Sequence, residues 1–137
     1  YTPSVELDDA VPTKVIHSDG SISKVVIITK AEKFDKIKAA LNDIGIGEMT
    51  VTKVSGCGVQ KGQTSYYRGA KVNMELLPKL KVEVVVSEVP VADVVKAAKK
   101  ALYTGNIGDG KIFVYDVADV VRISTGARGK DALKYEE

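Results

Sequence analysis

Hydrophobic positions follow a regular pattern from residue 24 onward. The β-branched run over 25–28 is typical of a buried strand. A helix is predicted next, because four apolar residues, spaced at offsets of three, seven and ten from the first, fall on one helix face: Phe34, Ile37, Leu41 and Ile44. Gly45 predicts the end of this helix. Residues 49–54 predict a second strand.

The second half of the chain gives the same kinds of element. Alternating valines at 82, 84 and 86 predict a third strand. Pro90 suits the first turn of a second helix, whose apolar face reaches Leu102, and residues 112–115 predict a fourth strand. The order strand, helix, strand, strand, helix, strand is that of a ferredoxin-like βαββαβ sandwich of the α+β class. Two helices cover only one face of the sheet, so we expect self-association through the other face.

Residues 1–22 differ from the rest of the chain. They mix prolines, serines and a glycine with isolated apolar residues and show neither helical nor strand periodicity. Their net charge is −3, which leaves +5 on residues 23–137 out of a total of +2. We therefore expect a flexible acidic tether over 1–22, either a processed end or the edge of a longer polypeptide, and one domain over 23–137.

Composition excludes several classes of function. The 137 residues, 45% hydrophobic and 28% charged, are typical of one soluble domain. No apolar run approaches the ~20 residues of a membrane span, so any membrane contact would go through a partner. A charge of +2 is too small for nucleic-acid binding through a basic coat. One cysteine and one histidine exclude an intrachain disulfide and argue against zinc sites and histidine catalysis, in agreement with a cytoplasmic protein.

The connection between the second and third predicted strands is unusually long. About 20 residues without apolar periodicity stand where hairpin loops have two to five. We expect a mobile loop over about 57–75, because long insertions in compact domains are generally functional or disordered. Tyr66, Tyr67 and Arg68 are residue types that anchor interfaces, so we expect them to bind a partner. A floppy loop with locally packed tyrosines is the alternative.

A glycine-rich turn precedes the fourth predicted strand, over residues 105–111. Glycines let the main chain approach a ligand with exposed N–H groups, and Lys111 adds a positive charge, which together suit phosphate oxygens. A helix cap followed by a tight turn is the plainer interpretation. Arg122 and Arg128 follow; their planar donors match phosphate geometry, although solvated surface charge is the commoner role.

These same segments resemble the two signature stretches of the PII signal-transduction family. The first covers 56–62 with 67–69, and the second runs over 104–114 and on through 122–126. The likeness extends over about 24–133, and 77–79 also fits. The chain is identified as a divergent member of this family. The resemblance implies a nitrogen-signalling homotrimer without enzymatic activity, with nucleotide clefts between neighbouring subunits.

The resemblance also implies the site residues. The nucleotide, ATP or ADP, would contact the following residues: Ile28, Thr50, Gly56, Gly58, Gln60, Glu83, Val85, Gly108, Asp109, Gly110, Lys111, Arg122 and Arg128. Of these, the contacts with adenine and ribose would be Ile28, Thr50, Glu83 and Val85, and those with the phosphates Gly108, Gly110, Lys111 and Arg122. Gln60 would hold Mg²⁺ together with the nucleotide. The small-molecule effector 2-oxoglutarate would bind at the base of the loop, to Gln60, Lys61, Gly62 and Lys79.

The loop is implied to report energy and carbon status together. In family members that serve ammonium transporters, a loop arginine plugs the cytoplasmic mouth of the channel, and Arg68 holds that place here. The resemblance thus implies an ammonium transporter as partner and a location in the cytoplasm or at the cytosolic face of the membrane. The tether over 1–22 raises the hypothesis that the domain is fused to such a transporter.

Three positions depart from the family pattern. Val72 stands where some members carry a uridylylated tyrosine, so we expect no modification by that route. Val59 and Ser124 replace two phosphate-contacting arginines, so we expect ATP to lose its advantage over ADP or AMP, and 2-oxoglutarate binding to be weakened. Arg128 is a candidate for compensation.

Two other classes share the fold. One is a small acylphosphatase-like enzyme, although no nucleophile and base are clustered in the sequence. The other is an RNA-binding module, although only Phe113 and Tyr115 place aromatic rings on a strand.

Overall fold

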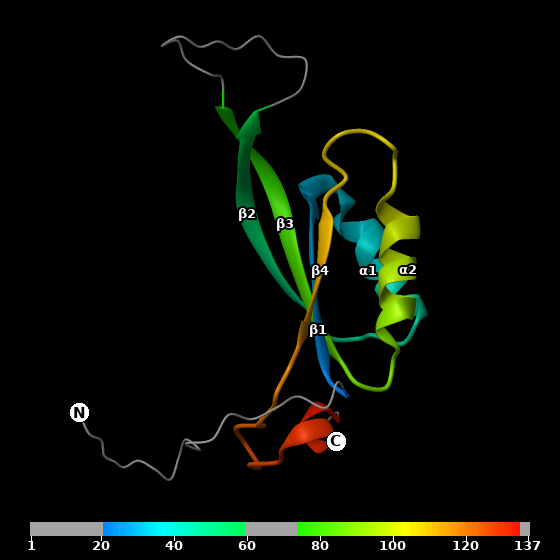
Figure 1. The fold of residues 1–137 in the computed structure, drawn as a ribbon, viewed down its shortest axis with the longest axis vertical. Helices are drawn as coiled ribbons and strands as arrows, with labels where there is room; N and C mark the ends of the chain where they lie inside the picture. The colour runs from blue at the N-terminus through cyan, green and yellow to red at the C-terminus, as the bar shows by residue number, and fades with distance from the viewer. Residues whose placement is uncertain (1–20, 60–73, 135–137) are drawn as a thin grey trace, which may run out of the picture.

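The computed structural model describes residues 21–59 and 74–134 (Figure 1). Its elements in chain order are β1 (Ser23–Lys30), η2 (Ala31–Lys33), α1 (Phe34–Asp43), β2 (Thr50–Val59), β3 (Met74–Val86), α2 (Val91–Leu102), β4 (Lys111–Asp116) and η3 (Gly129–Leu133). The sheet has the order β2-β3-β1-β4, and all neighbouring strands are antiparallel. The predicted ferredoxin-like α+β fold is confirmed.

The hydrophobic core lies between the sheet and the two helices, which cover the same face (Figure 1). Alternate residues of the two central strands point into it, and the helices contribute the apolar stripe that their periodicity predicts. Its fully buried members include Val25, Ile27, Ile37, Leu41, Val82, Val84, Val94 and Ala98. Each such large side chain contributes roughly 1.5–3 kcal/mol by its burial.

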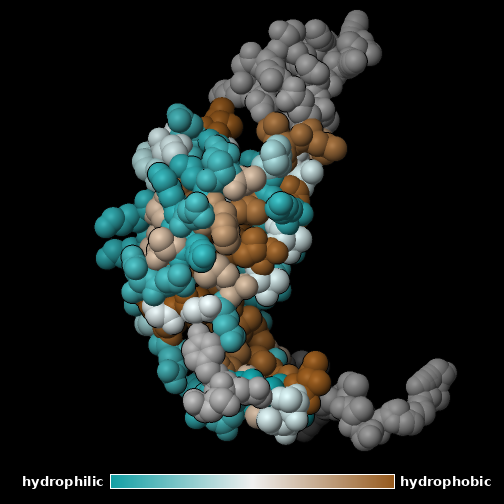
Figure 2. Space-filling model, turned by 180° about the vertical axis from the view of Figure 1, so that it is seen from behind, coloured by the Kyte–Doolittle hydropathy of each residue, from teal (hydrophilic) through white to brown (hydrophobic). Residues whose placement is uncertain are grey.

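Within residues 21–59 and 74–134, no helix covers the opposite face of the sheet. Val85, Phe113 and Tyr115 are 39%, 41% and 50% exposed there, with the Lys24 ammonium 5.3 Å from the centre of the Tyr115 ring. Figure 2 shows hydrophobic side chains in a broken band along the concave side of the molecule. In a single chain this apolar surface is in contact with water, as the sequence predicted.

Strands β2 and β3 continue beyond the rest of the sheet. β1 pairs with β3 as far as Lys79, whereas the β2–β3 pairing runs on to Val59 and Met74, so a two-stranded ribbon projects from the sheet (Figure 1). Pro78 is tolerated because one edge of β3 is unpaired at this level. The ladder therefore includes both ends of the predicted loop. Residues 60–73, like residues 1–20, lie outside the described part of the chain.

The segment after β4 is more ordered than a polar tail. An isolated bridge joins Val121 to Arg128, and η3 follows with Ala132 buried. Asp119 accepts hydrogen bonds from the backbone N–H groups of Val120 and Gly129, which hold the ends of this hairpin together. Neither α-helix of the described chain has the length and apolar character that crossing a bilayer requires.

Candidate functional site

One carboxylate organises the glycine-rich turn between α2 and β4. Asp109 accepts hydrogen bonds from the backbone N–H groups of Thr104 (2.7 Å) and Gly105 (3.0 Å) and from the Thr104 hydroxyl. The hydroxyl bond, and after it the Thr104 N–H bond, holds the pKa of the Asp109 carboxyl below its usual value. Asp109 therefore stays charged at neutral pH and is bound to the backbone of its own turn.

Two positions of this turn require glycine. Gly108 and Gly110 have φ angles of 102° and 113°, a region that other residues rarely adopt. A Cβ on Gly110 would lie 2.0 Å from the carbonyl oxygen of Ile28. Lys111 lies opposite Ile28 in the β1–β4 ladder. The structure thus brings together five of the predicted nucleotide-binding residues, Ile28 and residues 108–111.

Two lysines lie beside Gly108. A Cβ built on Gly108 would be 3.1 Å from Cε of Lys30 and 3.9 Å from the ammonium nitrogens of both Lys30 and Lys79. Neither lysine has an ion-pair partner among the residues that the structure describes. The Lys30 charge contributes to the lowered pKa of the nearby Asp109 carboxyl, and two positive charges held close together favour a further anion between them. A main-chain turn flanked by two ammonium groups is suited to a ligand with several negatively charged oxygens.

Gly56, at the base of the projecting ribbon, makes room for Lys79. A Cβ at this position would be 3.1 Å from Cγ of Lys79. Glycine at this position leaves room for the Lys79 side chain, whose ammonium group lies beside Gly108. Gly58, another of the predicted nucleotide contacts, lies within the β2–β3 ladder, opposite Glu75.

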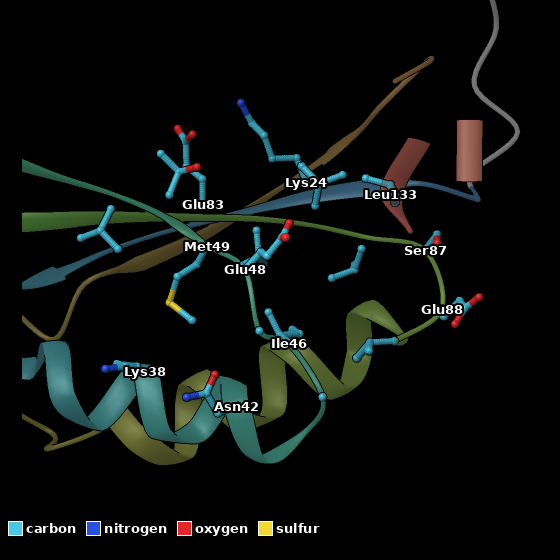
Figure 3. A pocket seen from close by; sticks show the side chains of 18 of the residues that line it. Lys24, Lys38, Asn42, Ile46, Glu48, Met49, Glu83, Ser87, Glu88 and Leu133 are labelled. Carbon is cyan, nitrogen blue, oxygen red and sulfur yellow. The ribbon is translucent and has the colours of Figure 1, made fainter. Parts of the chain in front are cut away.

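A cavity of about 1090 Å³ contains most of the predicted base and ribose contacts. Thr50, Glu83 and Val85 line it, together with residues from the end of α1 and from η3. Figure 3 shows Met49 and Ile46 on the helix side of the sheet and Glu83 and Lys24 on the other side. Glu83 pairs with Val26, two residues before Ile28, so the cavity and the turn are about 7 Å apart along β1.

The segment after β4, which carries the two predicted arginines, lies at the opposite end of the molecule from the turn between α2 and β4 (Figure 1). Arg128 donates from Nε (2.8 Å) to Asp119 and forms an ion pair with it, and the Arg128 hydrogen bond lowers the pKa of the Asp119 carboxyl. Arg122 donates to the carbonyl oxygen of Lys134. Within one chain, neither arginine lies beside Gly108 or Gly110.

Several predicted residues lie outside the described part of the chain. They are Gln60, Lys61, Gly62, Tyr66, Tyr67 and Arg68. Within residues 21–59 and 74–134, no group of three or more metal-ligating side chains is present. The predicted metal ligand, Gln60, is among the residues that are not described.

Sequence reasoning missed two residues of this site, Thr29 and Lys30. The Thr29 hydroxyl donates a hydrogen bond to the carbonyl oxygen of Asp109 at 2.9 Å, and the Lys30 ammonium lies beside Gly108. A polar residue at an inward position of β1 was the available sign for Thr29. Nothing in the sequence distinguished Lys30 from the other surface lysines.

Known proteins resemble the chain over nearly all of the described domain. A nitrogen regulatory PII-like protein of Bacillus subtilis is 46% identical over 114 residues, which cover 83% of this chain and 98% of that protein. The structure of the B. subtilis GlnK–ATP complex is 42% identical, with a TM-score of 0.70 over 82% of this chain and 96% of that one. Arabidopsis thaliana PII bound to citrate is 35% identical, with a TM-score of 0.67 over 83% and 94%.

A family model agrees with these relatives. The model described as nitrogen regulatory protein P-II matches residues 22–127. This match confirms the resemblance inferred from the two signature stretches, and with it the prediction of a regulatory protein rather than an enzyme. The chain belongs to the nitrogen regulatory protein P-II family.

Proposed function

We propose that this chain binds an adenine nucleotide, ATP or ADP, between the subunits of a homotrimer and thereby controls the conformation of its 57–75 loop. The observation that carries the proposal is the convergence at Gly108 of a glycine turn and two ammonium groups without ion-pair partners in the described chain. Such a site fits the phosphates of a nucleotide. The B. subtilis GlnK structure contains ATP, which supports the same ligand here.

A trimer would account for two features that one chain leaves unexplained. The sheet face with Val85, Phe113 and Tyr115 is apolar and exposed, and contact with other copies would bury it. The segment that carries Arg122 lies at the opposite end of the molecule from the turn, so this arginine would reach a phosphate in a cleft with a neighbouring copy. Each cleft would then combine the turn of one subunit with the arginine of the next.

The test of this proposal is titration calorimetry of the purified chain with ATP, ADP, AMP and GTP, combined with analytical ultracentrifugation. We expect a trimer that binds adenine nucleotides and not GTP. The proposal would be refuted if the chain were a monomer or bound none of ATP, ADP and AMP.

The nucleotide preference is expected to differ from that of members with arginines at 59 and 124. Val59 and Ser124 cannot donate charged hydrogen bonds, each of which is commonly worth ~1.5–3 kcal/mol. We expect the dissociation constants for ATP and ADP to agree within about threefold, with Ser124→Arg tightening ATP binding by about tenfold or more. Calorimetry on both proteins measures this. ATP binding more than about thirtyfold tighter than ADP in the unmodified chain would contradict it.

The carboxylate effector 2-oxoglutarate is the second ligand of the proposal. Lys79 lies at the turn and can pair with a carboxylate, and the Arabidopsis relative is bound to citrate, which also carries several carboxylates. Mg²⁺ would be held by nucleotide oxygens and Gln60, a set that needs no cluster of protein carboxylates. Mg²⁺, when bound, would supply positive charge that offsets the negative charges of the phosphates and the oxoacid.

The proposed partner is an ammonium transporter, reached through Arg68. A charge reversal at an anchor residue costs most of the binding energy of a small interface. We expect Arg68→Glu to abolish binding to the transporter in a pull-down and to leave the nucleotide affinity unchanged. Lys71→Glu, a charge reversal in the same loop, is the matched control. Undiminished association of the Arg68 variant would reject the assignment.

A further inference from the structure

Thr29 interrupts the inward, apolar face of β1. Val25, Ile27 and Thr29 alternate along this face, and Thr29 is only 1% exposed. A hydroxyl in such a position costs free energy unless it forms a hydrogen bond. Valine has the same shape and would serve the core without that requirement. The hydroxyl therefore calls for an explanation other than packing.

The hydroxyl is bonded to the glycine-rich turn. Thr29 Oγ1 donates to the carbonyl oxygen of Asp109 at 2.9 Å, across 80 residues of sequence. Contact here is close, because a Cβ on Gly110 would lie 3.0 Å from the Thr29 Cα. The hydrogen bond therefore fixes the peptide group that joins Asp109 to Gly110 at the end of β1.

The orientation of that peptide group has a direct consequence for ligand binding. The C=O and N–H of a trans peptide point in opposite directions. Because the Asp109 carbonyl is held toward β1 and the core, the Gly110 N–H points away from the core. Without the Thr29 bond, the two glycines on either side of Asp109 would let this peptide rotate at small cost.

We infer that Thr29 is a positioning residue for the phosphate subsite: its hydroxyl aims the Gly110 N–H at a phosphate group of the nucleotide. The inference rests on the proposed function, because it assigns Thr29 a role in binding that ligand. It predicts an effect on phosphate recognition that is separate from any effect on the base, since Thr29 does not line the cavity that contains Thr50 and Glu83.

The test compares Thr29→Val with Thr29→Ser, which keeps the hydroxyl. Ser23→Ala is the matched control, because Ser23 is the other buried hydroxyl of β1 and lies at the far end of the strand. Titration calorimetry with ADP and with adenosine separates phosphate from base recognition. Amide hydrogen exchange over 104–110, measured without nucleotide, reports the order of the turn directly.

We expect Thr29→Val to bind ADP roughly tenfold more weakly and adenosine unchanged, since one buried hydrogen bond is lost. Exchange at Thr104 and Gly105 should be faster in this variant. Thr29→Ser and Ser23→Ala should bind ADP like the unmodified chain.

Two results would overturn the inference. One is an ADP affinity of Thr29→Val within about twofold of the unmodified chain, and the other is an equal loss for ADP and adenosine, which a merely structural role would produce. If the unmodified chain bound no nucleotide, the proposed function would fail on its own. The exchange measurement would then decide alone, and unchanged exchange over 104–110 would refute the positioning role.

Discussion

Gly110→Ala is expected to lower the affinity for ADP by about a hundredfold or more, the largest effect of any single substitution in the described chain. The new Cβ would lie 2.0 Å from the Ile28 carbonyl oxygen, and the φ angle of 113° disfavours any residue with a side chain. The clash is with backbone atoms of Ile28 and Thr29, which cannot move aside as a flexible side chain could, so the turn must move away from β1. Titration calorimetry with ADP measures the loss.

Gly129→Ala is the control for this substitution. Gly129 also has a positive φ angle, 65°, but a Cβ there would meet nothing within 4 Å. It therefore carries backbone strain of roughly 1 kcal/mol without the clash. We expect its ADP affinity to match that of the unmodified chain. An ADP affinity of Gly110→Ala within about threefold of the unmodified chain would show that the turn does not hold the phosphates.

The double substitution Lys30→Gln, Lys79→Gln is expected to weaken ADP binding by about a hundredfold, and each single substitution by about tenfold. Both ammonium groups lie beside Gly108, and hydrogen bonds to charged groups are the stronger ones. Adenosine lacks phosphates, so its affinity should change little. Calorimetry at two salt concentrations should also find a weaker salt dependence in the double variant.

Lys53→Gln is the matched control for the lysine variants. Lys53 is an exposed lysine on β2, outside the turn. The Lys53→Gln substitution removes one positive charge from the chain, as Lys79→Gln does, but leaves the site unchanged. A loss of ADP affinity in this control equal to that of Lys79→Gln would mean that overall charge, and not the placement of Lys30 and Lys79, attracts the ligand.

The parts of the site that the sequence predicted are those that depend on local backbone chemistry. Gly108 and Gly110 could be assigned to a close-approach turn because glycine is the residue that such a turn requires. The strands and helices followed from periodicity, since alternating valines fit the half-buried β3 and the spacing of Ile37 and Leu41 fits an amphipathic helix. The family resemblance then gave the residues around the turn their roles.

The parts that the sequence missed depend on contacts between distant segments. Lys30 and Lys79 meet at Gly108 only because β1 and β3 pair in one register, which places these two lysines opposite each other. The hydrogen bond from Thr29 to Asp109 spans 80 residues and has no local sign. The ribbon beyond Gly56 was assigned to a loop because residues 57–75 show no apolar periodicity, yet strand pairing continues there.

The interpretation of Arg128 also changes with the structure. The sequence made it a candidate to replace a lost phosphate contact. In the structure its guanidinium is paired with Asp119 of its own hairpin, an exposed ion pair that contributes little to stability. The family resemblance places Arg122 among the phosphate contacts, so Arg122 is the arginine proposed to reach the nucleotide of the neighbouring subunit.

The central claim is that each nucleotide contacts two copies of the chain, and mixed trimers test it most directly. Gly110→Ala disrupts the glycine-rich turn that one subunit contributes to a cleft, and Arg122→Ala removes the arginine that the next subunit contributes. Each variant alone should form trimers that bind ADP poorly. Subunits refolded together in equal amounts should recover high affinity at about a quarter of the clefts, those that combine an intact turn with an intact arginine. No recovery in verified mixed trimers would place the turn and the arginine in the same chain and contradict the account.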